Sequence, residues 1–200
     1  MHNQYPLLAF KVCLYSRLRL LNYTFGSFVF SYAVPQFAYS DISCSVHAFK
    51  LISLNVKGLS NFRKRRTIFL WCRKRKADLV FLQETHSIAA TENQWRNEWG
   101  AEMISSHGSS NSRGVAILFK NGTDCSITHK IVDPKGRYII LKACIQDKDY
   151  VRVNVYAPNK LYKDQVNFFS NLLSILQNEN LDSLDNIILG GDLNLSLIHI

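Results

Sequence analysis

Residues 187–194, with the sequence IILGGDLN, show the pattern that decides the fold of this chain. Three apolar residues are followed by Gly190, Gly191 and Asp192, so an apolar run ends abruptly in a carboxylate. Short apolar runs bounded by turn signals are typical of buried strands, and α/β proteins place polar functional groups where such strands end. Other apolar runs occur in SLNVKGL (53–59), FLQETH (81–86), RGVAILF (113–119) and VNVYAPN (153–159).

The hydrophobic periodicity extends this pattern over most of the chain. It predicts helices over residues 61–76, 90–100 and 162–177, the last with an apolar stripe of Val166, Phe169, Leu172, Leu173 and Leu176. In the first helix Phe62, Phe69 and Cys72 are expected on one face. Strands are predicted over residues 51–56, 78–83, 114–119, 137–145, 150–156 and 186–189. Because three consecutive strands interrupt the alternation of strands and helices, we expect a mixed sheet with helices outside.

The composition fits a single globular domain. The 200 residues are 47% apolar and 20% charged, which is sufficient for a buried core and argues against disorder and coiled coil. The five cysteines form no C-x-x-C pair, so a zinc knuckle or a disulfide scaffold is not indicated. A reducing compartment, nuclear or cytoplasmic, is therefore expected.

The net charge of +9 has one local source, residues 61–76, which hold eight basic side chains and no acid. A local basic run indicates a polyanionic partner such as DNA, or a nuclear address, but it also fits a solvated helix face. The basic residues are Arg63, Lys64, Arg65, Arg66, Arg73, Lys74, Arg75 and Lys76.

Residues 1–49 differ from the rest in being rich in aromatic residues and poor in charge. Residues 20–40 carry no charge and follow Arg17 and Arg19, which is the outline of a signal anchor. Several polar residues weaken this span, so we favour an appended segment without a fold of its own. The domain is then expected over residues 50–200, with no membrane role and no stable protein partner.

The polar residues at the strand ends suggest one chemistry when they are taken together. Each alone has a structural explanation, since asparagine and aspartate favour turns and a glutamate can cap a helix. Together, Glu84 can ligate a hard divalent cation and Asp192 can orient or deprotonate a water. Asn55, Tyr156 and Asn194 can donate to phosphoryl oxygens. The absence of a histidine or cysteine cluster favours Mg²⁺, with Mn²⁺ as the alternative.

In order and spacing, the five sequence blocks quoted above resemble the endonuclease/exonuclease/phosphatase superfamily. Within it they resemble most the apurinic-type endonuclease domain of LINE-type (non-LTR) retrotransposons. The resemblance covers about residues 49–195. It implies a four-layer α/β sandwich of two facing mixed sheets, and Mg²⁺-dependent hydrolysis that nicks DNA during retrotransposition.

The resemblance also assigns roles to individual residues. It implies that Asn55 lies near metal and phosphate, that Glu84 binds the metal and that Tyr156 contacts phosphate. Asp192 and Asn194 match the pair that positions the nucleophile and the phosphate. His86 matches a supporting position behind the metal ligand.

The end of the chain departs from the family pattern. Family members continue to an aspartate and a Ser-Asp-His sequence, which supply a second metal ligand and a histidine that stabilises the pentacovalent phosphate. His199 follows Asn194 too closely to be that histidine. We therefore expect a domain truncated at its C-terminus, with little or no nuclease activity. The alternatives are a phosphatase or sphingomyelinase-like hydrolase, a non-catalytic nucleic-acid-binding remnant and, last, a membrane-anchored protein.

Overall fold

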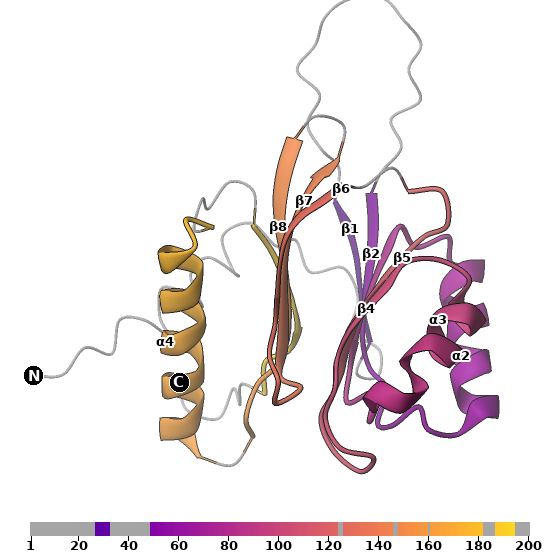
Figure 1. Cartoon of the computed structure of the whole chain (residues 1–200), viewed down its shortest axis with the longest axis horizontal. Helices are drawn as coiled ribbons and strands as arrows, with labels where there is room; N and C mark the ends of the chain where they lie inside the picture. Colours follow the sequence, from indigo (N-terminus) through magenta and orange to yellow (C-terminus); the bar gives the residue numbers. More distant parts are fainter. Residues whose placement is uncertain are drawn as a thin grey trace, which may run out of the picture.

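The protein forms two facing β-sheets with helices on both outer faces (Figure 1). A computed structural model describes residues 27–32, 49–123, 126–145, 148–159, 161–181 and 187–194. Across the molecule the layers are α4, the second sheet, the first sheet, and α2 with α3. The predicted four-layer α/β sandwich is confirmed.

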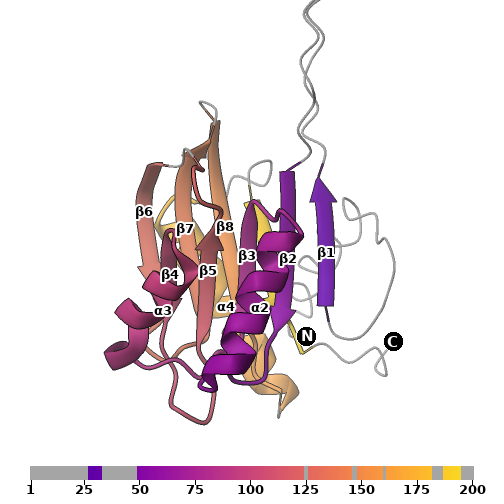
Figure 2. The ribbon, with the colours of Figure 1, turned by 90° about the vertical axis from the view of Figure 1, so that its right-hand side faces the viewer.

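The first sheet has five strands in the order β1-β2-β3-β5-β4 (Figure 2). Only β2 and β3 are parallel, so the sheet is mixed. The strands are β1 (Ser27–Tyr32), β2 (Phe49–Asn55), β3 (Leu79–Gln83), β4 (Met103–Ser106) and β5 (Val115–Phe119). The outer face is covered by α2 (Phe62–Lys74) and α3 (Glu92–Trp99), and the short 3₁₀ helix η1 (Ala89–Thr91) precedes α3.

The second sheet has four strands in the order β6-β7-β8-β9. Here β8 and β9 are parallel and the other pairs antiparallel. The strands are β6 (Ser126–Val132), β7 (Tyr138–Ile145), β8 (Lys148–Tyr156) and β9 (Ile187–Asp192), and the outer helix is α4 (Tyr162–Asn178).

Three apolar clusters fill the spaces between the four layers. Because side chains alternate across a strand, Ile52 packs toward α2 and α3, whereas Leu51 packs between the sheets. Phe69, Trp95 and Trp99 anchor the two outer helices to the first sheet. A third cluster joins α4 to the second sheet. Burial on both faces explains why the central strands are continuous apolar runs.

Three expectations about local structure were wrong. The strand at Val115–Phe119 belongs to the first sheet and not to the group of three consecutive strands expected from the sequence, which consists instead of the antiparallel strands β6, β7 and β8. Strands β4 and β6 were not predicted, because β4 has only four residues and β6 is a largely exposed strand at the sheet edge without an apolar run. Phe62 is 49% exposed, and Arg65 takes its place on the buried face of α2.

Part of the N-terminal segment lies in the fold. Strand β1 pairs antiparallel with β2 along its whole length. Residues 1–26 and 33–48 lie outside the described residues, so the domain boundary near residue 50 stays a prediction. Among the residues that the structure describes, no helix is long and apolar enough to span a membrane.

Candidate active site

The candidate site forms where parallel strands of both sheets end side by side. Asn55 at the end of β2 is in register with Gln83 at the end of β3, and Glu84 follows directly. In the second sheet Tyr156 at the end of β8 is in register with Asp192 at the end of β9. Because the sheets face each other, these four strand ends meet at one edge of the sandwich.

Two glycines let β9 approach its neighbours closely enough to deliver Asp192. A Cβ at Gly190 would lie 2.8 Å from Cδ2 of Phe81 in the opposite sheet. Gly191 has a φ of +133°, and a Cβ there would lie 2.0 Å from the carbonyl oxygen of Val155. Any larger side chain at these positions would push β9 away from the site.

The amide of Asn55 joins the carboxylates of the two sheets. Its Nδ2 donates to Oε1 of Glu84 at 3.0 Å and to Oδ2 of Asp192 at 2.8 Å. The two carboxylate oxygens therefore lie within about 6 Å of each other, since both are hydrogen-bonded to one nitrogen. Oδ1 of Asn55 accepts the backbone N–H of Lys57 at 3.1 Å, which fixes the amide. The structure thus brings together three of the residues predicted to form the site.

The backbone around Glu84 is held in an unusual conformation. Glu84 and His86 have left-handed φ values of 52° and 56°, which are costly for residues with a side chain. The carbonyl of Glu84 accepts the N–H of Gly58 at 2.6 Å, and the N–H of Thr85 donates to the Gly114 carbonyl at 3.0 Å. These bonds fix the loop that presents the carboxylate.

Tyr156 contributes a hydroxyl that stays protonated. Burial, and then the hydrogen bond to the Glu84 carboxylate, raise the pKa of Tyr156 to about 12, while the nearby charge of Arg137 opposes the shift. The hydroxyl is therefore a neutral donor at physiological pH, beside the metal ligand that the sequence predicted.

Asn194 and His86 support the site from its edge. Nδ2 of Asn194 donates to the Ala157 carbonyl at 2.7 Å, so this amino group holds the loop and is not directed at the carboxylates. The backbone N–H of Asn194 donates to Oδ1 of Asp192 at 3.1 Å and orients that carboxylate. The ring of His86 lies over Gly58, where a Cβ would come 2.8 Å from Nδ1.

A buried amide pair beneath the site was missed by the sequence reasoning. Nε2 of Gln83 donates to Oδ1 of Asn154 in the opposite sheet at 2.7 Å and to Oγ of Ser53 at 3.2 Å. Nδ2 of Asn154 donates to the carbonyls of Leu82 and Ala116 at 3.1 and 2.9 Å. The sequence did hold a signal for this pair: Asn154 lies within the apolar strand VNVY, and a buried amide requires hydrogen-bond partners.

The donors at this edge fit a divalent cation of the hard type. Mg²⁺ is usually bound through one or two carboxylates, with waters and substrate phosphates completing its shell. Glu84 and Asp192 supply two carboxylates, and the Asn55 amide lies between them. No group of three His, Cys, Asp or Glu side chains suited to a metal occurs among the described residues.

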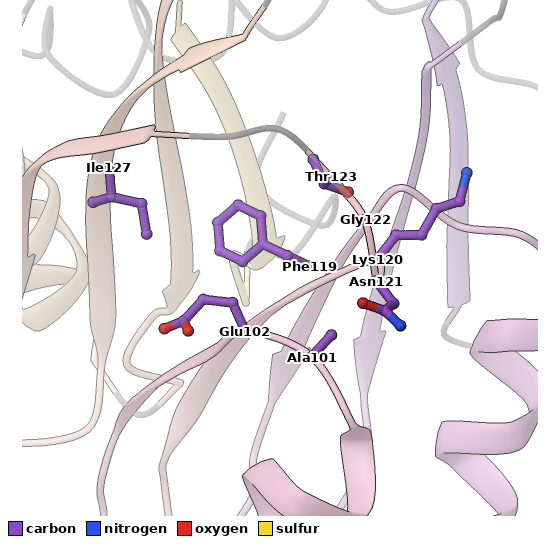
Figure 3. A pocket seen from close by; sticks show the side chains of 8 residues that line it. All are labelled: Ala101, Glu102, Phe119, Lys120, Asn121, Gly122, Thr123 and Ile127. Atoms are coloured by element: carbon purple, nitrogen blue, oxygen red, sulfur yellow. The ribbon is translucent and has the colours of Figure 1, made fainter.

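A small hollow at the opposite end of the first sheet is separate from this site (Figure 3). It has a volume of about 120 Å³ and lies beside Glu102, Phe119 and Ile127. Phe119 is in register with Leu79 at the start of β3, whereas the site lies beyond the other end of β3. The hollow is therefore not part of the strand-end cluster.

The basic run of α2 has two kinds of residues. Arg65 is buried, pairs with Glu98 through Nε–Oε2 at 2.6 Å and Nη2–Oε1 at 2.8 Å, and stacks on Trp95. Arg73 donates to the carbonyls of Glu98 and Trp99 at the end of α3. Both arginines hold α3 in place. The prediction that Arg65 contacts nucleic acid was wrong because its side chain is buried, whereas a contact by Arg73 stays a prediction. Arg73 is exposed, and so are the other six basic side chains: Arg63, Lys64, Arg66, Lys74, Arg75 and Lys76.

Two facing mixed sheets with polar side chains at adjoining strand ends are the architecture of α/β-sandwich phosphoesterases. Residues 52–200 match the model of the Endonuclease/Exonuclease/phosphatase family, and the chain belongs to this family. Its members are hydrolases that include nucleases and phosphatases. The superfamily resemblance noted in the sequence is confirmed.

One similar curated protein is the Transposon TX1 uncharacterized 149 kDa protein of Xenopus laevis. It is 29% identical over 150 residues, which is 75% of this chain but 11% of that protein. The chain thus spans only a small part of this relative, whose name assigns it to a transposon.

Solved structures share the fold at low sequence identity. D. rerio TDP2, in complex with a single-strand DNA product, has a TM-score of 0.54 and 18% identity, over 74% of this chain and 61% of that chain. A mannosyl-6-phosphatase of Bacteroides thetaiotaomicron has a TM-score of 0.56 and 15% identity, over 76% and 67%. An AP endonuclease of Archaeoglobus fulgidus has a TM-score of 0.51 and 21% identity, over 74% and 58%.

Proposed function

We propose that this domain hydrolyses phosphodiester bonds in DNA, nicking one strand, and that this reaction serves retrotransposition. The observation that carries the proposal is the Asn55 amide, which binds a carboxylate from each sheet at the same edge. The transposon relative supports DNA as the substrate and retrotransposition as the setting.

The cation in this proposal is Mg²⁺, or Mn²⁺, held by Glu84 and Asp192 with Asn55 beside them. When bound, such a cation polarises a phosphoryl oxygen and offsets the charge that develops during hydrolysis. The two carboxylates and the neutral amide match the ligands that this kind of ion accepts.

The chain's own side chains orient the reacting groups. Oδ1 of Asp192 is fixed by the N–H of Asn194 and Oδ2 by the amide of Asn55, so the carboxylate can hold a water in one orientation. The Tyr156 hydroxyl can donate to a phosphoryl oxygen, because its pKa of about 12 keeps it protonated at neutral pH. Asn194 acts as a positioning residue for Asp192.

The direct test is nicking of supercoiled plasmid by excess protein with Mg²⁺, over incubations long enough to detect slow turnover. Glu84→Gln removes one carboxylate of the site with little change in shape. Glu102→Gln is the matched control, because Glu102 is an exposed carboxylate beside the distant hollow. In line with the low activity expected from the sequence, we expect the wild type to nick only slowly, and this nicking to be lost in Glu84→Gln and kept in Glu102→Gln.

A second readout does not depend on turnover. Titration of Mn²⁺, followed by its electron paramagnetic resonance signal, measures cation affinity directly. We expect Glu84→Gln to weaken Mn²⁺ binding about tenfold or more and Glu102→Gln to leave it unchanged, because few ligands hold the ion. Nicking that persists in Glu84→Gln, or Mn²⁺ affinity equal in all three proteins, would contradict the proposal. DNA binding without Glu84-dependent nicking would favour the non-catalytic alternative.

A further inference from the structure

Two arginines that the sequence reasoning left unassigned lie on the Tyr156 side of the site. Arg113 has a left-handed φ of 63°, and its carbonyl accepts the N–H of His86 at 2.9 Å. The next residue, Gly114, donates its N–H to the carbonyl of Gly136 at 3.0 Å, and Arg137 follows. Backbone hydrogen bonds therefore join both arginine loops to the loop that carries Glu84.

The guanidinium of Arg137 is fixed against Tyr156. It lies 5.3 Å from the centre of the tyrosine ring, and Nη1 donates to the Tyr156 carbonyl at 3.2 Å. The backbone N–H of Tyr156 in turn donates to the Arg137 carbonyl at 2.7 Å. The half-buried guanidinium of Arg137 thus stacks on the Tyr156 ring, whose hydroxyl is hydrogen-bonded to the Glu84 carboxylate.

Neither arginine forms an ion pair within the part of the chain that the structure describes. The carboxylate of Asp133 is near Arg137, but its two oxygens accept the backbone N–H groups of Lys135 and Arg137 at 3.1 and 2.9 Å. Burial, and then the positive charge of Arg113, lower the pKa of Arg137, whereas Tyr156, Asp133 and Asp164 oppose this shift. The charges of Arg113 and Arg137 therefore act on each other, while the Asp133 carboxylate is held by backbone N–H groups.

We propose that Arg113 and Arg137 bind a second phosphate of the nucleic acid strand, next to the phosphate that lies at Asn55, Glu84 and Asp192. The planar guanidinium fork matches phosphate oxygens, and a stacked arginine is already oriented for them. The inference rests on the proposed function and narrows its substrate. A polynucleotide offers two phosphates at adjacent positions, whereas a small phosphomonoester offers one.

The first experiment measures binding of a fluorescent single-stranded oligonucleotide without divalent cation, over a range of salt concentrations. The variants are Arg113→Gln and Arg137→Lys, the second of which keeps the charge but loses the fork. Lys130→Gln is the charge-matched control for Arg113→Gln, because Lys130 is exposed on β6, the strand farthest from β9 in the second sheet. Thermal melting of each variant shows that it is folded.

We expect each arginine variant to weaken binding about tenfold, as loss of one charge-assisted contact does. Arg113→Gln should also reduce the salt slope by about 0.7, because one fewer counterion is released. Lys130→Gln should change affinity by less than about twofold. Equal effects of Arg113→Gln and Lys130→Gln on affinity and salt slope would overturn the subsite.

A second experiment locates the phosphate. Oligonucleotides in which one phosphate is replaced by a neutral methylphosphonate are compared with the parent. At one position, the methylphosphonate should weaken binding to the wild-type protein. In Arg113→Gln and Arg137→Lys, where the contact with that phosphate is already lost, the same methylphosphonate should weaken binding no further. Equal losses in wild type and variants at every position would contradict the proposal. Inorganic phosphate should compete only weakly, because it supplies one of the two phosphates.

The two proposals fail separately. If Arg-dependent binding is found but no Glu84-dependent nicking, the subsite stands and hydrolysis by this chain does not. If nicking depends on Glu84 but binding is independent of both arginines, hydrolysis stands and the subsite is rejected.

Discussion

Replacing Arg65 tests whether the basic run of α2 is partly a structural element. Arg65→Ala removes one partner of an ion pair in which the arginine side chain is 3% exposed and Glu98 is 19% exposed. It also leaves the Leu59 carbonyl, which accepts Nη1 at 2.8 Å, without this partner. Breaking a buried ion pair costs about 3–5 kcal/mol of folding stability. Because Glu98 is partly exposed, we expect the lower end of this range, about 3 kcal/mol.

The matched control is Arg66→Ala, which changes the same charge one residue later. The Arg66 side chain is exposed and makes no hydrogen bond or ion pair with the described residues, so its removal should change stability by less than about 0.5 kcal/mol. By thermal unfolding, Arg65→Ala should lower Tm by about 6–12 °C, since 1 kcal/mol corresponds to about 2–4 °C at this size. Equal Tm values for the two variants would refute the structural role of Arg65.

Three further predictions concern ionisation and the buried amides. The hydrogen bond from Arg65 is the main cause that lowers the pKa of Glu98, so its contribution to stability is present above the pKa of the unfolded chain and is lost as pH falls. Denaturant midpoints measured between about pH 6 and pH 3 should therefore fall more steeply for wild type than for Glu98→Gln; parallel curves would contradict this. Glu84→Gln should lower the pKa of Tyr156 from about 12, because the carboxylate raises it through a hydrogen bond and its charge. The tyrosinate absorbance difference between each protein and its Tyr156→Phe form measures that pKa, and no change on removing the Glu84 charge would disprove the contact. Asn154→Ala should destabilise the fold by about 3 kcal/mol in denaturant titrations, because Gln83 and two backbone carbonyls lose a buried partner; a loss no greater than that of an exposed site such as Asn111→Ala would argue against the inter-sheet network.

Much of the fold could be predicted because its central elements have strong periodic patterns. Helix α2 begins after Asn61, whose side chain accepts the N–H of Lys64, and α3 ends at Gly100 in a left-handed conformation. Both boundaries are within two residues of those predicted from the sequence. Strands β4 and β6 were missed because pairing with neighbouring strands, and not an apolar run, holds them in place.

The residues of the candidate site could be predicted from the sequence, but the hydrogen bonds between them could not. Asn55, Glu84 and Asp192 were found because each follows an apolar strand, but the amide bridge depends on how closely the sheets approach. Arg137 was missed since its stacking partner is set by the register of β7 and β8. Arg65 was assigned by residue type alone. Its spacing from Phe69 and Cys72 already placed it on the buried face of α2.

The hydrogen bond between Asn55 and Asp192 spans 137 residues, and this separation has a consequence for synthesis on the ribosome. At about 5–20 residues per second, Asp192 is added roughly 7–30 seconds after Asn55, long enough for the first sheet to form while its half of the site has no partner. Under the proposed function, cation binding needs carboxylates from both sheets and therefore begins only when the second sheet docks. Capture of Mn²⁺ by a nascent chain would then report that this docking is complete.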